Sequence, residues 1–230
     1  MKAAFFSDVH GNLEALQAFL KDTDDCDSRY FCGDAVGYGD RPNEVCEAIR
    51  QESTTAVVGN HDYFVLGKLD FDHGKDHLYK TTWTKNCLSE SNKKWLQSLP
   101  EKIDLDVDGF QIEICHASPW DMTTYLYRDS PNLFKAMPRD GASLVVGHTH
   151  HAFSHSTSTG TIVNCGSVGF PRSGMAGANY FIFDSQNGIW SHKIATYNSS
   201  ELQKRLQSNG WDEAIIKKIK DPSSKHTTIS

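Results

Sequence analysis

The chain has 230 residues and a formal net charge of −6, with 38% hydrophobic and 23% charged residues. This balance excludes a disordered chain, and the length suffices for one domain with a sizeable core. The negative charge argues against stable nucleic-acid binding, which needs clustered Lys and Arg. The longest apolar runs, such as Leu144-Val145-Val146, are too short to span a bilayer, and no signal peptide pattern opens the chain. We therefore expect a cytoplasmic protein without membrane contact.

Strand and helix patterns alternate over the first sixty residues. In the order strand, helix, strand, helix, strand, the predicted segments are 2–7, 12–21, 29–32, 42–51 and 54–58. Asn12 can cap the first helix, because its side chain can accept a hydrogen bond from the first turn. This alternation predicts a parallel sheet covered by helices.

The rest of the chain changes from helical to antiparallel patterns. Residues 62–100 are helical in character with Ser89 as a cap, and residues 103–114 alternate around an Asp108-Gly109 turn, which predicts a β-hairpin. Further strands are predicted at 143–146, 152–156, 161–165, 179–184 and 189–195. The whole pattern predicts an α/β fold, a four-layer α/β/β/α sandwich with two mixed β-sheets packed face to face and helices outside.

No repeat or low-complexity linker divides the sequence, so we expect one domain over residues 1–198. Residues 199–220 are predicted to form short C-terminal helices packed on the same domain, and the polar segment 221–230 a disordered tail. The six cysteines contain no CxxC pair and are predicted to be reduced thiols.

Polar side chains follow five predicted strands at the point where each strand ends. The segments are Asp8-Val9-His10, Gly33-Asp34, Gly59-Asn60-His61-Asp62, Cys115-His116 and Gly147-His148-Thr149-His150. Because ligand sites gather at the carboxyl ends of strands in α/β sheets, these segments are predicted to converge. Carboxylate, imidazole and amide groups are ligands for Mn, Fe, Zn, Ni or Co. In extended backbone, residues i and i+2 point the same way, so Asp8 with His10, and His148 with His150, are each expected to face one cavity.

Each of these residues also has an ordinary explanation when it is taken alone. His116 can be a hydrogen-bonded histidine after a strand, Asp8 an acid at a helix N-terminus, and Asn60 a turn residue. The case for a metal centre therefore depends on the five segments together.

In this order the segments resemble the calcineurin-like metallophosphoesterase superfamily, whose pattern is DxH, GDxx, GNHD, H and GHxH. The segments SDVHGNLEAL, GDAVGYG, PNEV, CHASP and NCGSVGFPRSG resemble its small bacterial and archaeal phosphodiesterase-like branch. The resemblance covers roughly residues 1–195 and leaves the C-terminal helices out. It implies that residues 1–198 form a metallophosphoesterase domain.

The resemblance implies two divalent metal ions as cofactors, either Mn, Fe, Zn, Ni or Co, with Mn as the first choice. The implied ligands are Asp8, His10 and His150 for the first ion, Asn60, His116 and His148 for the second, and Asp34 bridging both with one oxygen to each. The implied catalytic residues are His61, Asp34 and Asn60, with His61 as the general acid.

The implied reaction is hydrolysis of a phosphodiester by a hydroxide held between the two ions. The substrate is expected to be a small phosphoester or nucleotide-like molecule, contacted by Arg172, Asn12 and Tyr38. For Arg172 a solvated loop charge is the competing interpretation. The protein is expected to be a monomer or a small homo-oligomer.

Two other functions stay open. A phosphomonoesterase or nucleotide phosphatase of the same mechanism is the nearer one. A protein phosphatase is disfavoured, because the related enzymes carry Asp-Arg-Gly where this chain has Gly37-Tyr38-Gly39. The fold also serves in a retromer subunit as a protein-interaction scaffold that lacks the third-motif histidine, and His61 argues against that role.

Aromatic residues near the motifs either stack on a base or aryl group or pack in the core. They are Tyr38, Tyr63, Phe64, Trp120 and Phe170. Phe170 stands where the family pattern leads us to expect Gln, and Asp40 where it has Pro, which limits any transfer of substrate preference.

Overall fold

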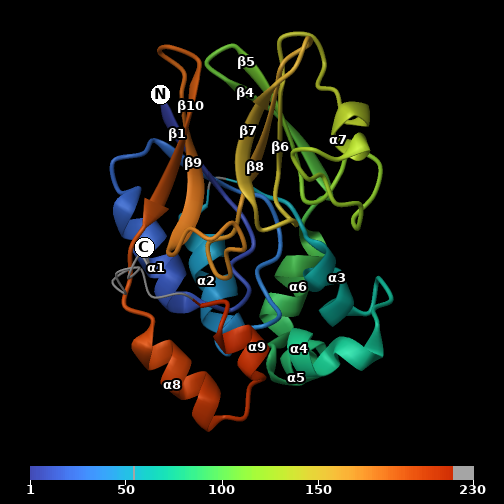
Figure 1. Ribbon diagram of the computed structural model, residues 1–230, viewed down its shortest axis with the longest axis vertical. Helices are drawn as coiled ribbons and strands as arrows, with labels where there is room; N and C mark the ends of the chain where they lie inside the picture. Colours follow the sequence, from blue (N-terminus) through green and yellow to red (C-terminus); the bar gives the residue numbers. More distant parts are fainter. Residues whose placement is uncertain (54, 220–230) are drawn as a thin grey trace, which may run out of the picture.

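The computed structural model describes residues 1–53 and 55–219, in which ten strands form two five-stranded mixed sheets (Figure 1). The first sheet has the order β10-β9-β1-β2-β3. Its strands are β1 (Lys2–Phe6), β2 (Ser28–Phe31), β3 (Thr55–Ala56), β9 (Ala178–Asp184) and β10 (Ile189–Ala195). Strands β1, β2 and β3 are parallel, so their carboxyl ends meet at one edge, while β9 and β10 are antiparallel additions.

The second sheet has the order β4-β5-β6-β8-β7. Its strands are β4 (Lys102–Val107), β5 (Phe110–Cys115), β6 (Ser143–Val146), β7 (Ala152–Ser156) and β8 (Thr161–Cys165). The central strands β5, β6 and β8 are parallel, and β4 and β7 pair antiparallel at the edges. The predicted hairpin at Asp108-Gly109 is confirmed as the β4–β5 connection.

The helices and helical turns lie outside the two sheets (Figure 1). They are α1 (Leu13–Asp22), α2 (Pro42–Glu52), α3 (Asn60–Leu66), η1 (His73–Lys75), α4 (Asp76–Tyr79), α5 (Thr81–Cys87), α6 (Glu90–Ser98), α7 (Pro131–Lys135), α8 (Ser200–Ser208) and α9 (Glu213–Ile216). The predicted caps are confirmed, since Asn12 accepts from Ala15 N–H and Ser89 from Asn92 N–H. No helix within residues 1–53 and 55–219 has the length and apolar character needed to cross a bilayer.

The alternation of side chains along the strands sorts the core into layers. Phe5 on β1 points between the sheets and packs with Ile114 and Val163 of the second sheet. Phe6 points outward and stacks on Phe19 of α1, with ring centroids 4.3 Å apart. On the outer face of the second sheet, β-strand side chains pack against Leu133 of α7. The predicted α/β/β/α sandwich is confirmed.

The structure differs from the sequence prediction at two elements. Strand β3 ends at Ala56 rather than at residue 58, because Val58 N–H donates to the carbonyl of Pro100. Position 54 lies outside the described residues. Helix α7 was not predicted, since a five-residue helix is too short to show a periodic pattern. The predicted tail at 221–230 lies outside the described residues.

Candidate metal centre

Loops from both sheets meet at the carboxyl ends of their parallel strands. The first sheet supplies the loops after β1, β2 and β3, and the second sheet supplies those after β5 and β6. The side chains that these loops bring together, all of them buried, are Asp8, His10, Asp34, Asn60, His61, His116, His148 and His150. The convergence that the strand ends predicted therefore exists in the folded chain.

The first close group contains Asp8, His10 and His150, whose ligand atoms all lie within 4.8 Å of one another. Asp8 Oδ1 lies 3.1 Å from His150 Nε2 and 3.5 Å from His10 Nε2. The two imidazole Nε2 atoms are themselves 3.1 Å apart. This is the set of residues that the resemblance assigns to the first ion.

The second close group contains Asp8, Asp34 and His116. Asp34 Oδ2 lies 3.2 Å from His116 Nε2 and 3.6 Å from His10 Nε2, so it faces both groups. Asn60 Oδ1 lies 3.1 Å from the same His116 nitrogen. Asp34 thus occupies the position between two clusters that a bridging ligand requires.

The backbone determines which nitrogen each histidine presents to the cluster. In three of the rings, Nδ1 lies within hydrogen-bond distance of a backbone carbonyl oxygen. The distances are 2.9 Å from His10 to Val36 O, 2.8 Å from His116 to Cys32 O and 2.6 Å from His150 to Phe170 O. Donation from Nδ1–H leaves the lone pair on Nε2, which faces the carboxylates. Such bonds orient the histidines of metal sites.

These residues fit a metal centre because carboxylate oxygens and imidazole nitrogens converge without a hydrogen-bond donor of the described chain between them. Asp8 Oδ1 and Asp34 Oδ2 are buried and have no hydrogen-bond partner within the described part of the chain. Unpaired buried carboxylate oxygens are costly. A divalent cation at each cluster would satisfy both oxygens and the converging Nε2 lone pairs.

The two oxygens of Asp34 have different surroundings. Its Oδ1 accepts the backbone N–H of His61 at 2.8 Å, whereas its Oδ2 has no hydrogen-bond partner among the described residues. The same carboxylate therefore also holds the loop after β3.

His148 lies beside the second group rather than within it. Its Nε2 is 3.1 Å from the carbonyl of Thr123, and its backbone N–H donates to Asp8 Oδ2 at 3.0 Å. The ring packs edge-on against His116, with centroids 5.3 Å apart. Donation from Nε2–H would leave Nδ1 as the nitrogen available to a metal.

The backbone around these ligands is left-handed rather than extended. Asp8 has a φ of 54° and His10 a φ of 50°, and His148 and His150 have values of 64° and 60°. The expectation that extended backbone aligns residues i and i+2 is therefore wrong, although both pairs do face the cavity. The loops after β1 and β6 each reach the site through alternating left-handed residues.

His61 lies at the edge of the cluster among aromatic rings. Its ring centroid is 4.8 Å from Tyr38, 4.8 Å from Tyr79 and 4.9 Å from His10. Its Nδ1 is buried and has no hydrogen-bond partner among the described residues. Burial lowers the pKa of His61 well below its usual value, with the Asp34 carboxylate acting in the opposite direction.

Burial and the neighbouring carboxylates also shift the pKa values of the other histidines in different directions. Burial lowers the pKa of His148 and of His150 to about 4. Burial acts in the same direction on His116, but the adjacent Asp34 carboxylate outweighs it and raises the pKa of His116 to about 10, so a cation that binds at Nε2 would replace a proton there. For Asp34 itself burial is outweighed by the surrounding histidines, His116 first, and its pKa falls well below the usual range. The cluster thus keeps its carboxylate charged and attracts a positive charge.

The three residues expected to contact substrate occupy different environments. Arg172 lies beside the site, where one guanidinium nitrogen donates to Tyr38 Oη at 3.3 Å and the buried Nε has no partner in the described chain. Tyr38 is only 4% exposed and packs on His10. Asn12 is fully buried, and its amide donates to Gly169 O and Tyr197 Oη while it caps α1. Asn12 therefore faces the protein interior rather than the site.

Sequence reasoning missed two tyrosines at the rim of the site. Tyr125 stacks on His148 with ring centroids 4.1 Å apart, and Tyr127 lies parallel to Tyr125. Both belong to the long connection after β5, where no periodicity or motif distinguishes them. Of the aromatic residues that the sequence did select, Tyr38 and Phe170 are buried.

Comparison with known proteins places this arrangement in a family. The model of the calcineurin-like phosphoesterase superfamily domain matches residues 1–188, and the chain belongs to this family of metal-dependent phosphoesterases. An uncharacterized protein of Methanocaldococcus jannaschii, MJ0912, is 37% identical over 204 residues, which cover 80% of this chain and 83% of that protein.

Two of the solved structures that resemble this chain cover nearly all of it. A metallophosphoesterase from Sphaerobacter thermophilus has a TM-score of 0.78 and 29% identity, covering 95% of this chain and 98% of its own. The hypothetical protein PH1004 from Pyrococcus horikoshii shares the fold with a TM-score of 0.79 and 20% identity, covering 96% and 98%. The family assignment agrees with the resemblance read from the motifs.

Proposed function

We propose that this chain is a phosphodiesterase that hydrolyses a small phosphoester with two divalent metal ions, manganese being the first to test. The observation that most supports this is the pair of unpaired buried oxygens, Asp8 Oδ1 and Asp34 Oδ2, among the imidazole Nε2 atoms. When bound, two such ions supply a water molecule of lowered pKa and neutralise charge on the phosphate.

The first ion would be held by Asp8, His10 and His150, and the second by Asn60, His116 and His148, with Asp34 shared. Their donor set of carboxylate, imidazole and amide oxygen suits Mn, Fe, Zn, Ni or Co. Support is strongest for the first set and for the group around Asp34, because their ligand atoms already lie close together.

Two further residues would act on the substrate itself. Arg172 would donate to the non-bridging phosphate oxygens, which its buried and unpartnered Nε among the described residues supports. His61 would give a proton to the leaving oxygen. Because burial disfavours its charged form, we expect the anionic phosphate beside the ring to stabilise the protonated imidazole.

Two variants separate these roles. In Asp34→Asn we expect most bound metal and most activity to be lost, because the shared oxygen between the clusters loses its charge. In His61→Gln we expect the metal content to stay, while kcat falls by about 10²–10⁴, the usual contribution of a general acid. Metal content by elemental analysis and turnover of bis(p-nitrophenyl) phosphate measure the two effects, with His155→Gln on β7 as a matched control.

Equal loss of metal in both variants would contradict the separate roles. Turnover of p-nitrophenyl phosphate in place of the diester would establish the phosphomonoesterase alternative. Bound metal without turnover of either ester would favour the scaffold.

A further inference from the structure

A row of aromatic rings leads from the metal centre to the protein surface. Tyr125 stacks on His148 at 4.1 Å, and Tyr127 lies parallel to Tyr125 with centroids 5.5 Å and planes 5° apart. The two tyrosines are 41% and 42% exposed. Large aromatic side chains aligned and open to solvent beside a polar site are placed to contact a ligand.

A hollow of about 280 Å³ opens beside the outer ring of this row. Tyr127, His151, Ala152 and Phe153 line it together with the polar residues Arg128, Asp129 and Ser173. The Ser173 hydroxyl is buried and has no hydrogen-bond partner in the described chain. The volume lies at the lower end of ligand pockets, so the hollow suits one ring system rather than a whole nucleotide.

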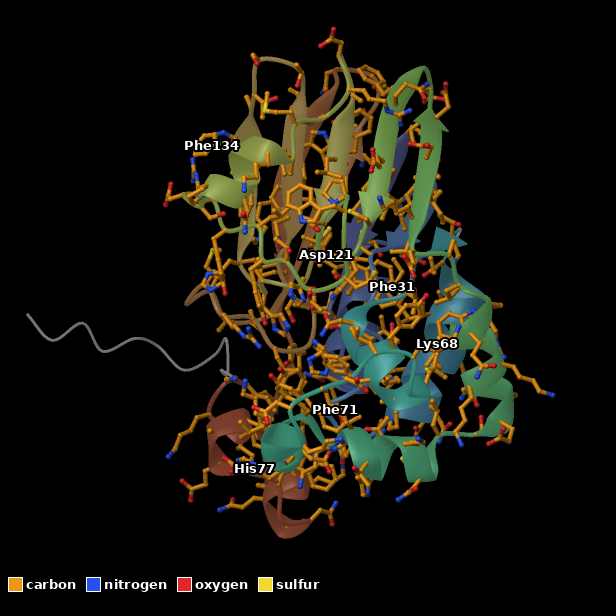
Figure 2. The ribbon with its side chains drawn as sticks, turned by 90° about the vertical axis from the view of Figure 1, so that its right-hand side faces the viewer. Phe31, Lys68, Phe71, His77, Asp121 and Phe134 are labelled. Atoms are coloured by element: carbon orange, nitrogen blue, oxygen red, sulfur yellow. The ribbon has the colours of Figure 1, made fainter. Side chains whose placement is uncertain are left out.

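The loop that carries the tyrosines is braced before any ligand arrives. Asp121 accepts hydrogen bonds from the backbone N–H groups of Thr123 and Thr124, at 2.8 and 2.6 Å, and from the hydroxyl of Ser118 at 3.4 Å. The carbonyl of Thr123 in turn contacts His148. Figure 2 shows Asp121 on this connection. A rigid loop loses less entropy on binding, which favours recognition by these rings.

We propose that Tyr125, Tyr127 and the hollow form the subsite for the organic group of the substrate, and that this group is a nucleobase. The inference rests on the proposed phosphoester hydrolysis. A base stacks on any aromatic face, and its edge can pair with the donors and acceptors of Arg128, Asp129 and Ser173. Arg172 immediately precedes Ser173 in the chain, so phosphate and base are recognised by adjoining residues.

Binding of two matched phosphates tests the subsite without requiring turnover. Adenosine 5′-monophosphate and ribose 5-phosphate differ only in the base, and calorimetry on the metal-loaded chain gives both affinities. We expect the nucleotide to bind about 5–150-fold more tightly, the range that one stacked base supplies. Tyr127→Ala should remove most of this difference and leave ribose 5-phosphate binding unchanged, whereas Tyr127→Phe should keep it.

Phe134→Ala is the surface control, because Phe134 is 63% exposed on α7, which Figure 2 shows apart from Asp121. Equal affinities for the two phosphates in the natural sequence would overturn the subsite. An equal loss of affinity for the nucleotide and for ribose 5-phosphate in Tyr127→Ala would also overturn the subsite. Tighter binding of the nucleotide without turnover of any ester would support the subsite and reject the proposed function. Turnover of an ester without tighter binding of the nucleotide would support the proposed function and reject the subsite.

Discussion

At the scale of single residues, backbone strain is concentrated at the candidate metal ligands. Of the eight non-glycine residues with positive φ in the described chain, five are candidate ligands with φ between 50° and 64°, a region that L-residues seldom adopt: Asp8, His10, Asp34, His148 and His150. Each such residue costs on the order of 1–3 kcal/mol and persists only where the surroundings hold it. The strained positions mark the site that the chain maintains at the expense of stability.

Asp62 is the residue that holds two of these loops together. Its Oδ1 accepts the backbone N–H groups of Ala35 and Val36 at 3.0 and 3.2 Å, and its Oδ2 accepts those of Asp34 and Gly59 at 3.1 and 2.9 Å. The fully buried carboxylate therefore ties the loop after β2 to the loop after β3.

We predict that Asp62→Ala lowers the free energy of unfolding by about 3 kcal/mol or more, because four buried N–H groups lose their acceptor. Asp62→Asn should lose less, since it keeps one oxygen. Chemical denaturation measures both, and the exposed Asp25→Ala should change little. A loss in Asp62→Ala no larger than in Asp25→Ala would show that the loops hold their geometry without this carboxylate.

At the scale of elements, the C-terminal helices pack behind the site although they lie outside the region matched by the family model. Leu206 of α8 and Ile215 of α9 form a buried cluster with Tyr38 and Phe170. Arg205 on α8 makes a double hydrogen bond with Asp40 at 2.6 and 3.0 Å. The helices thereby support the loop whose Tyr38 ring packs on His10 and His61.

Leu206→Ala tests how much this support contributes. The side chain is fully buried, so we expect a loss of about 2–5 kcal/mol in the free energy of unfolding, from burial and the cavity left behind. Urea unfolding provides the measurement. Ile189→Ala on β10, where the side chain is 54% exposed, is the control and should cost far less. Similar losses in both variants would mean that the helices pack only loosely.

At the scale of the whole molecule, the candidate metal centre lies where loops of the two sheets meet. Asp8 and Asp34 follow strands of the first sheet, whereas His116 and His150 follow strands of the second. Cations bound between them would link the two halves of the sandwich, and the unfolded chain cannot form such a site.

Metal binding should therefore stabilise the fold. At a divalent ion concentration about 100 times Kd, linkage gives about 2.7 kcal/mol, or roughly 5–11 °C in Tm for a chain of this size. Scanning calorimetry after chelation and after re-addition of manganese measures the shift. Asp34→Asn should lose most of it. An equal shift in that variant would place the bound metal elsewhere.

The sequence by itself determined the sandwich, the order of its strands along the chain and the polar strand ends that converge. These features depend on local periodicity and on the rule that parallel strands present their carboxyl ends at one edge. The motif residues Asp8, Asp34 and His116 could be singled out because they stand directly at those ends.

Only the tertiary structure decided what the loops do between the motifs. The left-handed backbone of Asp8 and His10, the single free oxygen of Asp34, and the stacking of Tyr125 on His148 all arise from contacts between segments far apart in the chain. No local pattern encodes such contacts, because a residue's neighbours across a loop are set by how the elements pack.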